Sequence, residues 1–235
     1  MRMLVLAGGF GTRLQSAVSL APKALAPVGD IPFLQFQLEH WVRQGIKSFV
    51  FLLHHQANLI KDFLDGPASG ILRDCQYDWL IEAEPLGTGG AVANAVTQLQ
   101  IQGDFLVTNA DTWLGSGVAD LMRSQAPALS VIRVDDAGRY GSVQFDQSYK
   151  VTTFLEKSVD VQAGWINAGM ALLNSKLFEQ LKPGVWSLEN SLFPSCANLG
   201  ILHAVPIQCD FIDIGIPTDY QRFCRWITAE RKGVL

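Results

Sequence analysis

The sequence has little charge, few cysteines and no long apolar run. Charged residues make up 17% of the 235 residues, and the formal net charge is −4. A nucleic-acid-binding surface normally needs a clustered basic stripe, so we expect no nucleic-acid partner. The longest apolar runs, such as 49–53, fall far short of the roughly 20 residues that span a bilayer, so we expect no membrane partner.

The cysteines give no sign of a metal or redox motif. Cys75, Cys196, Cys209 and Cys224 are scattered along the chain without CxxC spacing, and this pattern is typical of reduced thiols in a cytosolic protein. The chain begins in a strand-like segment and not with the charged and apolar regions of a signal peptide. We therefore expect a cytoplasmic location.

The first half of the chain alternates strand-like and helix-like segments. Asp30 is predicted to be the N-cap of a helix that ends at Gly45. Strands are predicted over 3–7, 47–53, 76–84 and from 104 up to Asp111, and further helices over 56–64 and 88–99. This alternation indicates right-handed crossovers and a Rossmann-like, mostly parallel sheet with helices on both faces.

The second half changes character. Consecutive strand-like segments with turn residues between them favour antiparallel hairpins. These strands are predicted over 129–134, 141–146 and 151–157, with another over 164–173. A helix-rich tail, with helices over 177–180, 188–198 and 219–227, surrounds two short strands near 201–206 and 211–213. With 49% hydrophobic residues and no linker, we expect one α/β domain over 1–235 that carries a small antiparallel insertion.

A glycine-rich loop follows the first predicted strand. The stretch LAGGFGTRL at 6–14 has Leu14 where a dinucleotide-binding fingerprint needs its third glycine, and it lacks the GK[ST] of a Walker loop. What remains is a loop whose backbone N–H groups can face a phosphate chain, with Arg13 and Lys23 as nearby cations. The alternative is a tight turn beside two surface cations.

Two aspartates follow apolar segments. Asp111 lies just past the strand-like segment that starts at 104, and Asp213 lies in the stretch FIDIG. Ligands of an open α/β sheet bind at strand ends, and Mg²⁺ takes one or two protein carboxylates together with phosphates and waters. The alternative to metal binding is that Asp111 caps the helix after it and that Asp213 is a turn residue.

The glycine loop and six later segments together resemble the sugar-1-phosphate nucleotidyltransferases, the pyrophosphorylases that make nucleotide sugars. These segments occur in that family's order and cover roughly residues 3 to 225. They are EPLGTGGAV (84–92), NADTW (109–113), RYGSV (139–143), FLEK (154–157), WINAGM (165–170) and FIDIGIPTDY (211–220). The resemblance implies a GT-A-like nucleotidyltransferase fold, with a nucleotide-binding half over about 1–135 and a sugar-binding half over about 136–235.

The resemblance also implies roles for individual residues. The expected reaction is attack by a sugar-phosphate oxygen on the α-phosphorus of a nucleoside triphosphate, with Mg²⁺ as the cofactor. The implied sets are Arg13 and Lys23 for catalysis; Leu6, Ala7, Gly8, Gly9, Gly11, Thr12, Glu84, Gly87, Thr88 and Asn109 for the nucleotide; Gly141, Glu156, Lys157 and Asn167 for the sugar; and Asp111 and Asp213 for the metal. One departure is Ala110, where the family commonly has glycine. Trp113 and Trp165 either line the sugar site or pack in the core.

The segment EPLGTGG bears on the choice of base. Guanine offers two adjacent donors, and the Glu84 carboxylate could accept from both, whereas uracil offers one. The segment resembles guanylyltransferases of the mannose and heptose type, so we expect GTP and D-glycero-α-D-manno-heptose 1-phosphate as substrates.

Three alternatives remain open. A uridylyltransferase or a mannose-type guanylyltransferase could use the same scaffold. A non-catalytic nucleotide-sugar-binding relative is expected to have lost Arg13, Lys23, Asp111 or Asp213, and all four are present. The sequence leaves the oligomeric state open, a homodimer included.

Overall fold

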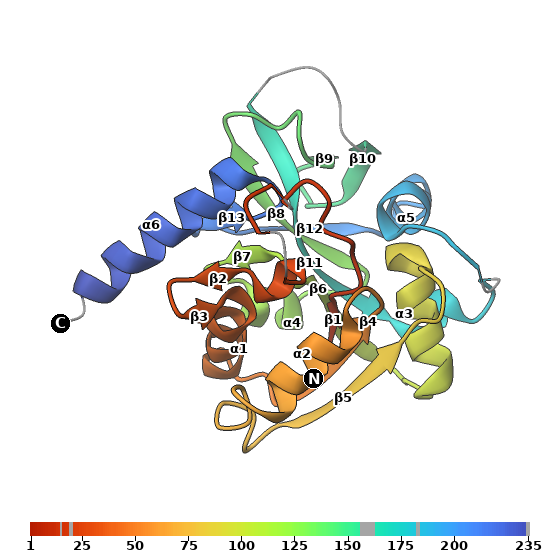
Figure 1. The fold of residues 1–235 in the computed structure, drawn as a ribbon. Coiled ribbons are helices and arrows are strands. Elements are labelled where there is room, and N and C mark those ends of the chain that lie inside the picture. Colours follow the sequence, from red (N-terminus) through yellow and green to blue (C-terminus); the bar gives the residue numbers. More distant parts are fainter. Residues whose placement is uncertain (15, 19–20, 156–162, 182–183, 234–235) are drawn as a thin grey trace.

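The computed structural model describes residues 1–14, 16–18, 21–155, 163–181 and 184–233 (Figure 1). Nine of the described strands form one mixed sheet. They are β1 (Met3–Leu6), β4 (Ser48–Leu53), β5 (Gln76–Ile81), β6 (Asp104–Asn109), β8 (Ala128–Val134), β9 (Ser142–Phe145), β10 (Val151–Leu155), β11 (Gly164–Asn174) and β12 (His203–Pro206). The order across the sheet is β10-β9-β11-β6-β1-β4-β5, with β8 paired to β11 and β12 paired to β8.

The first half of the chain forms the parallel part of this sheet. Strand β1 pairs in parallel with β4 and β6, and β4 pairs in parallel with β5. Between these strands run the helices α1 (Phe33–Arg43), α2 (Ala57–Asp65) and α3 (Gly87–Gln98). The prediction of a mostly parallel sheet from the strand–helix alternation is confirmed, because helical crossovers return each strand in the same direction.

The second half joins the same sheet. Strand β11 runs antiparallel to β6, β8 and β9, and β9 runs antiparallel to β10. The antiparallel pairing is as predicted, but the strands extend the central sheet and do not form a separate one. The reason is the length of β11: along one edge Ile166 pairs with β9 and then Met170–Asn174 pair with β6, while the other edge pairs with β8.

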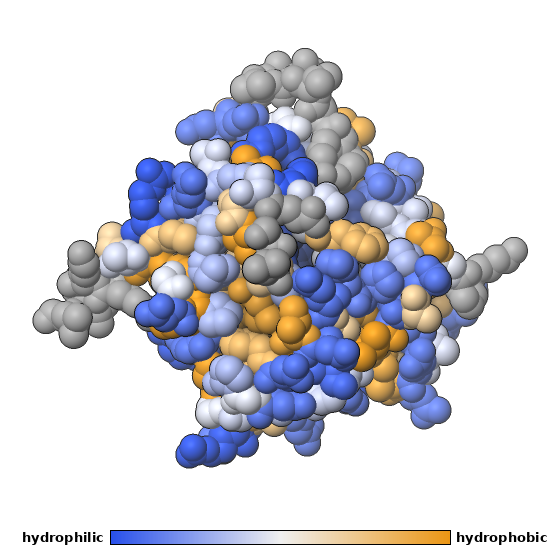
Figure 2. Space-filling view, viewed as in Figure 1, coloured by the Kyte–Doolittle hydropathy of each residue, from blue (hydrophilic) through white to orange (hydrophobic). Residues whose placement is uncertain are grey.

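Helices cover both faces of the sheet (Figure 1). Met3 and Val5 of β1 pack in a core with α1, α2 and α4 (Val118–Arg123), whereas Leu4 packs in a second core with α3 and α5 (Phe193–Asn198). This alternation follows from the two-residue period of a strand. On the face that Figure 2 shows, groups of hydrophobic residues lie among hydrophilic ones.

A third core joins the C-terminal helix to the sheet. The short strands β7 (Thr112–Leu114) and β13 (Phe211–Asp213) pair antiparallel. The helix α6 (Pro217–Gly233) packs Phe223 against Phe33 of α1, with ring centroids 4.7 Å apart, and against Trp113 of β7. The remaining described elements are β2 (Pro27–Val28), β3 (Ile31–Pro32), the 3₁₀-helices η1 (Lys23–Leu25) and η2 (Ser175–Phe178), and the π-helix η3 (Leu188–Leu192).

Two of the predicted element boundaries that were wrong lie next to the cavity or its supporting helix. Asp30 does not cap α1, because residues 27–32 form the β2–β3 hairpin and Pro32 takes the N-cap position. Strand β5 ends at Ile81 and not at residue 84, so that residues 82–86 form a loop before α3. All four cysteines are free thiols. Among the described helices, none combines the length and the apolar character needed to cross a membrane.

Candidate active site

A cavity of about 460 Å³ lies at the carboxyl ends of the parallel strands. The loops after β1, β5 and β6 form one wall, and residues of β11 and of the loop before β9 form the other. A second cavity of about 360 Å³ adjoins it and shares Leu6, Arg13, Lys23 and Asp111. Open α/β sheets bind their ligands at this position.

The glycine loop lines both cavities. Gly11 has φ +61°, and a Cβ added there would lie 3.1 Å from the Lys23 Cβ. Any side chain would therefore be strained by the backbone and would press on Lys23. Leu14, which is 1% exposed, anchors the end of the loop in the core beneath α6. The loop thus leaves backbone and Arg13 facing the cavities.

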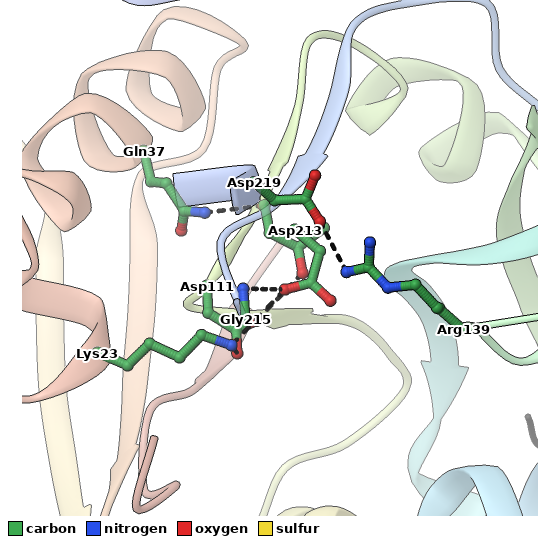
Figure 3. A network of polar contacts seen from close by, with 8 residues as sticks. Lys23, Gln37, Asp111, Arg139, Asp213, Gly215 and Asp219 are labelled. Carbon is green, nitrogen blue, oxygen red and sulfur yellow. Dashed lines mark hydrogen bonds and ion pairs between the residues drawn. The ribbon is translucent and has the colours of Figure 1, made fainter. Parts of the chain in front are cut away.

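Two carboxylates and one ammonium group meet at the centre of the site (Figure 3). Lys23 Nζ lies 2.5 Å from Asp111 Oδ2 and 3.6 Å from Asp213 Oδ1. The two aspartates converge because β7 and β13 pair, with Asp213 opposite Thr112, and because the Ile214 N–H donates to the Asp111 carbonyl at 3.0 Å.

A positive charge stabilises the neighbouring carboxylates of Asp111 and Asp213. Burial and the neighbouring Asp111 raise the pKa of Asp213, while Lys23 and the Gly215 N–H, which donates to Asp213 Oδ1 at 2.7 Å, oppose that rise. In the structure the Lys23 ammonium supplies positive charge to both carboxylates. Among the described residues no third acid, histidine or cysteine completes a metal cluster. Two carboxylates fit Mg²⁺, whose other ligands are then phosphates and waters.

Two side chains of helix α1 contact the backbone of β7, the strand that follows Asp111. The buried Gln37 donates from Nε2 to the Thr112 carbonyl at 2.8 Å (Figure 3), and His40 Nε2 lies 3.0 Å from the Leu114 carbonyl oxygen. Burial lowers the pKa of His40, which favours the neutral ring. These contacts hold the strand that follows Asp111, and sequence reasoning missed both residues because they look like ordinary polar positions on a helix.

An ion pair joins the loop before β9 to α6. Arg139 lines the cavity, and its Nη2 donates to Asp219 Oδ2 at 2.7 Å (Figure 3). The Asp219 side chain is 10% exposed, whereas that of Arg139 is 42% exposed. Arg139 lies in the RYGSV segment, for which no role of the arginine was predicted. The pair holds Tyr140 and Gly141 in the cavity wall.

The wall formed by β11 contains the predicted sugar-binding residues that the structure describes. Gly141 and Asn167 both line the cavity, and the Asn167 N–H donates to the Gly141 carbonyl at 2.8 Å. Glu156 and Lys157 lie outside the described residues. Trp113 is 6% exposed and packs in the third core, and neither it nor Trp165 lines the cavity.

The loop after β5 holds two glutamates that differ in position. Glu84 is exposed and does not line the cavity, whereas Glu82 does. Glu82 Oε2 accepts from the Leu86 N–H at 3.0 Å, and burial raises the pKa of Glu82, opposed by that N–H and by His54. Because the strand was predicted to run to residue 84, no sequence signal singled out Glu82, which in the structure immediately follows β5.

Most of the remaining predicted residues come together. Gly87, Thr88 and Asn109 line the larger cavity, and Thr88 donates to Glu189, a cavity residue that the sequence did not single out. Every described residue of the predicted site except Glu84 lines one of the two cavities. Those in at least one are Leu6, Ala7, Gly8, Gly9, Gly11, Thr12, Arg13, Lys23, Gly87, Thr88, Asn109, Asp111, Gly141, Asn167 and Asp213.

The chain is similar to known nucleotidyltransferases along most of its length. The family model "Nucleotidyl transferase" matches residues 2–196. The D-glycero-alpha-D-manno-heptose 1-phosphate guanylyltransferase of Campylobacter jejuni is 34% identical over 225 residues, which cover 95% of this chain and 98% of that protein. A mannose-1-phosphate guanylyltransferase of Mycobacterium tuberculosis is 31% identical over 93% of this chain, and the match spans 62% of that relative's length.

A solved structure has the same fold. HddC of Yersinia pseudotuberculosis, in a crystal structure complexed with GMP-PN, superposes with a TM-score of 0.83 at 32% identity and covers 96% of this chain and 99% of its own. The family match covers well over half of the chain, and the relative from C. jejuni spans nearly all of it. The protein belongs to the nucleotidyl transferase family.

Proposed function

We propose that this protein transfers the guanylyl group of GTP to D-glycero-α-D-manno-heptose 1-phosphate and releases pyrophosphate, giving a GDP-heptose. The observation that carries the proposal is the cavity in which the glycine loop, Arg13, Lys23 and the two aspartates converge. The relative from C. jejuni and the complex of HddC with a guanine nucleotide analogue support the choice of base and sugar. The four free thiols favour a reducing compartment, the cytoplasm.

The nucleotide half of the cavity supplies the groups that a triphosphate needs. Backbone N–H groups of the glycine loop face the phosphate chain, and Arg13 offers a planar fork of donors to its oxygens. Lys23 is held against Asp111 and Asp213, so its ammonium reaches the reacting phosphate without a large rearrangement. Both cations stabilise the charge that grows in the transition state.

The reaction needs positioning more than covalent help from the protein. An oxygen of the sugar phosphate attacks the α-phosphorus, the new P–O bond forms in line with the breaking one, and the electron pair of that bond leaves with pyrophosphate. Asp111 and Asp213 would hold Mg²⁺, which when bound neutralises phosphate charge. Gln37 keeps Asp111 in place through the Thr112 carbonyl.

Glu82 takes the base-selecting role that the sequence suggested for Glu84. Its carboxylate lies in the cavity, and one of its oxygens is oriented by the Leu86 N–H. Guanine presents a ring N–H and an amino group side by side, both donors, to such an acceptor. Uracil presents a single N–H flanked by carbonyl oxygens, which a carboxylate repels.

The other wall of the cavity takes the sugar. Gly141 and Asn167 line it, and Glu156 and Lys157, by resemblance to the family, contribute to sugar and phosphate binding. Arg139 adds a cation on this side, held by Asp219.

The experiment measures pyrophosphate release with Mg²⁺ for GTP, UTP, CTP, ATP and dTTP against the 1-phosphates of D-glycero-α-D-manno-heptose, mannose, glucose and N-acetylmuramate. We expect the GTP–heptose pair to give the highest kcat/KM. Preference for GTP with mannose 1-phosphate would keep the base and change the sugar. Preference for UTP would refute the role of Glu82, and no release with any pair would favour a binding protein.

A further inference from the structure

The first residues of η3 and the loop before it are tied to the start of α3 by a compact set of hydrogen bonds. Glu189 Oε2 accepts from the Thr88 hydroxyl at 2.6 Å and from the Ser187 hydroxyl at 2.7 Å. The Leu188 N–H donates to Thr88 Oγ1 at 2.9 Å. The Thr88 hydroxyl therefore gives its only proton to Glu189, and it has no donor left for a ligand.

Backbone contacts fix the same junction. The Trp186 carbonyl accepts from the N–H groups of Gly89 and Gly90 at 3.0 and 3.2 Å. A Cβ at Gly89 would lie 2.0 Å from the Trp186 ring, and a Cβ at Gly90 would lie 2.3 Å from the Gly184 carbonyl oxygen. Glycine at these positions is what allows the loop to approach the helix so closely. Glu189 is thus attached to a well-packed support.

The two oxygens of the Glu189 carboxylate differ in what they contact. Oε2 is held by two hydroxyl groups, whereas Oε1 has no hydrogen-bond partner among the described residues. Glu189 lines the main cavity and lies in a small adjoining recess with Asn109 and Asn167. These two amides come from the nucleotide and sugar walls respectively, so Glu189 lies where the two walls meet.

We propose that Glu189 is a specificity-determining residue whose free oxygen accepts a hydrogen bond from a hydroxyl group of the bound substrate. The proposal rests on the proposed nucleotidyl transfer. A carboxylate at this place attracts hydrogen-bond donors and repels phosphates and carbonyl oxygens. Because the N–H donors of the base are assigned to Glu82, the donors left on the two substrates are hydroxyl groups. That hydroxyl belongs either to the sugar of the sugar phosphate or to the ribose of the nucleotide, and both sources can be tested.

The variant Glu189→Gln separates the anchoring role from the ligand contact. The amide oxygen of glutamine can still accept from Thr88 and Ser187, so the junction is retained. The amide nitrogen then occupies the place of the free oxygen, and an acceptor becomes a donor. The matched control is Glu179→Gln, which removes an exposed carboxylate at the end of η2, outside the cavity.

The test measures binding and steady-state kinetics of the wild type and both variants with the nucleotide–sugar pair that the wild type uses best. Substrates include mono-deoxy analogues of the sugar 1-phosphate and the 2′-deoxynucleotide. We expect Glu189→Gln to weaken binding of one substrate by about 10- to 100-fold, the size of a hydrogen bond to a charged acceptor. That penalty should vanish for the one analogue that lacks the contacted hydroxyl, and Glu179→Gln should match the wild type.

The outcomes separate this inference from the proposed function. A penalty that disappears with a deoxy sugar assigns the hydroxyl to the sugar, and one that disappears with the 2′-deoxynucleotide assigns it to the ribose. A Glu189→Gln protein that folds normally and binds all substrates like the wild type would overturn the inference alone. A penalty equal for every analogue would also overturn it, because it would show a purely structural role. A wild type that binds no substrate would overturn both.

Discussion

The contact between α3 and Trp186 yields a stability prediction whose size follows from the structure. A methyl group at Gly89 would lie 2.0 Å from Cε3 and 2.1 Å from Cζ3 of Trp186. Non-bonded carbon atoms prefer about 3.5–4.0 Å, so in Gly89→Ala the ring would have to move by roughly 1.5 Å. Because the carbonyl of the same residue caps α3, the movement also strains those hydrogen bonds.

Three terms determine the change in the free energy of unfolding. Overpacking costs about 1–3 kcal/mol. Weakening of the two hydrogen bonds costs about 0.5–1.5 kcal/mol each. Alanine favours the helix over glycine by up to about 1 kcal/mol. Together these terms predict that Gly89→Ala lowers the free energy of unfolding by about 1–5 kcal/mol.

Urea unfolding followed by fluorescence provides the measurement, and an unchanged m-value would show that the midpoint reports stability alone. The control is Gly70→Ala, where an added Cβ has no heavy atom within 4 Å, and we expect a change within about 0.5 kcal/mol. A Gly89→Ala protein as stable as the wild type, or more stable, would refute the argument, because helix propensity would then outweigh the contact with Trp186.

Three further predictions concern the site. Asp111→Asn and Asp213→Asn should each lower the Mg²⁺-dependent rate of pyrophosphate release by at least about 10²–10³-fold with the fold intact, because each removes a charge that holds the metal. Glu82→Gln should reduce the preference for GTP over UTP by about 10- to 100-fold in kcat/KM, whereas Glu84→Gln should leave it unchanged. Asp219→Asn should lower the free energy of unfolding by about 1–3 kcal/mol in urea, because a charged hydrogen bond across the cavity wall is weakened, and it should raise the KM for the sugar phosphate more than that for GTP.

Each of these has a result that would contradict it. Full activity in either aspartate variant would remove that carboxylate from the mechanism. Loss of GTP preference in Glu84→Gln alone would return the base-selecting role to Glu84. For Asp219, the control is Asp120→Asn, which breaks an exposed pair whose side chains are 47% and 70% exposed and should cost about 0–1 kcal/mol. Equal losses of unfolding free energy in Asp219→Asn and Asp120→Asn would show that the partly buried ion pair contributes no more than the exposed one.

Much of the fold and of the site was predictable from local sequence patterns. Apolar runs between helical segments identified β1, β4 and β6, because the inner strands of a parallel sheet are buried on both faces. The glycine loop and the two aspartates were recognised from their places after apolar strands, and the structure brings Arg13 and Lys23 to the same cavity. These features depend on residues that are close together in the chain, so they can be predicted from the sequence alone.

Other features depend on contacts between distant segments. The pairing of β7 with β13 brings Asp213 beside Asp111, and no local pattern encodes which short strands will pair. The end of β5 at Ile81 decides that Glu82 faces the cavity and Glu84 does not, since a strand that continued would have turned both to the same side.

The support around the site also came from the tertiary structure alone. The Arg139–Asp219 pair and the Thr88–Glu189 hydrogen bond each join residues far apart in the chain. The residue types of these groups are ordinary surface types, and their role arises only once folding brings their partners within hydrogen-bond distance. The sequence by itself determined the alternation of strands and helices and the place of the glycine loop. The tertiary structure decided the strand order and which polar side chains meet, because strand pairing, hydrogen bonds and charge pairs depend on distance in space and not along the chain.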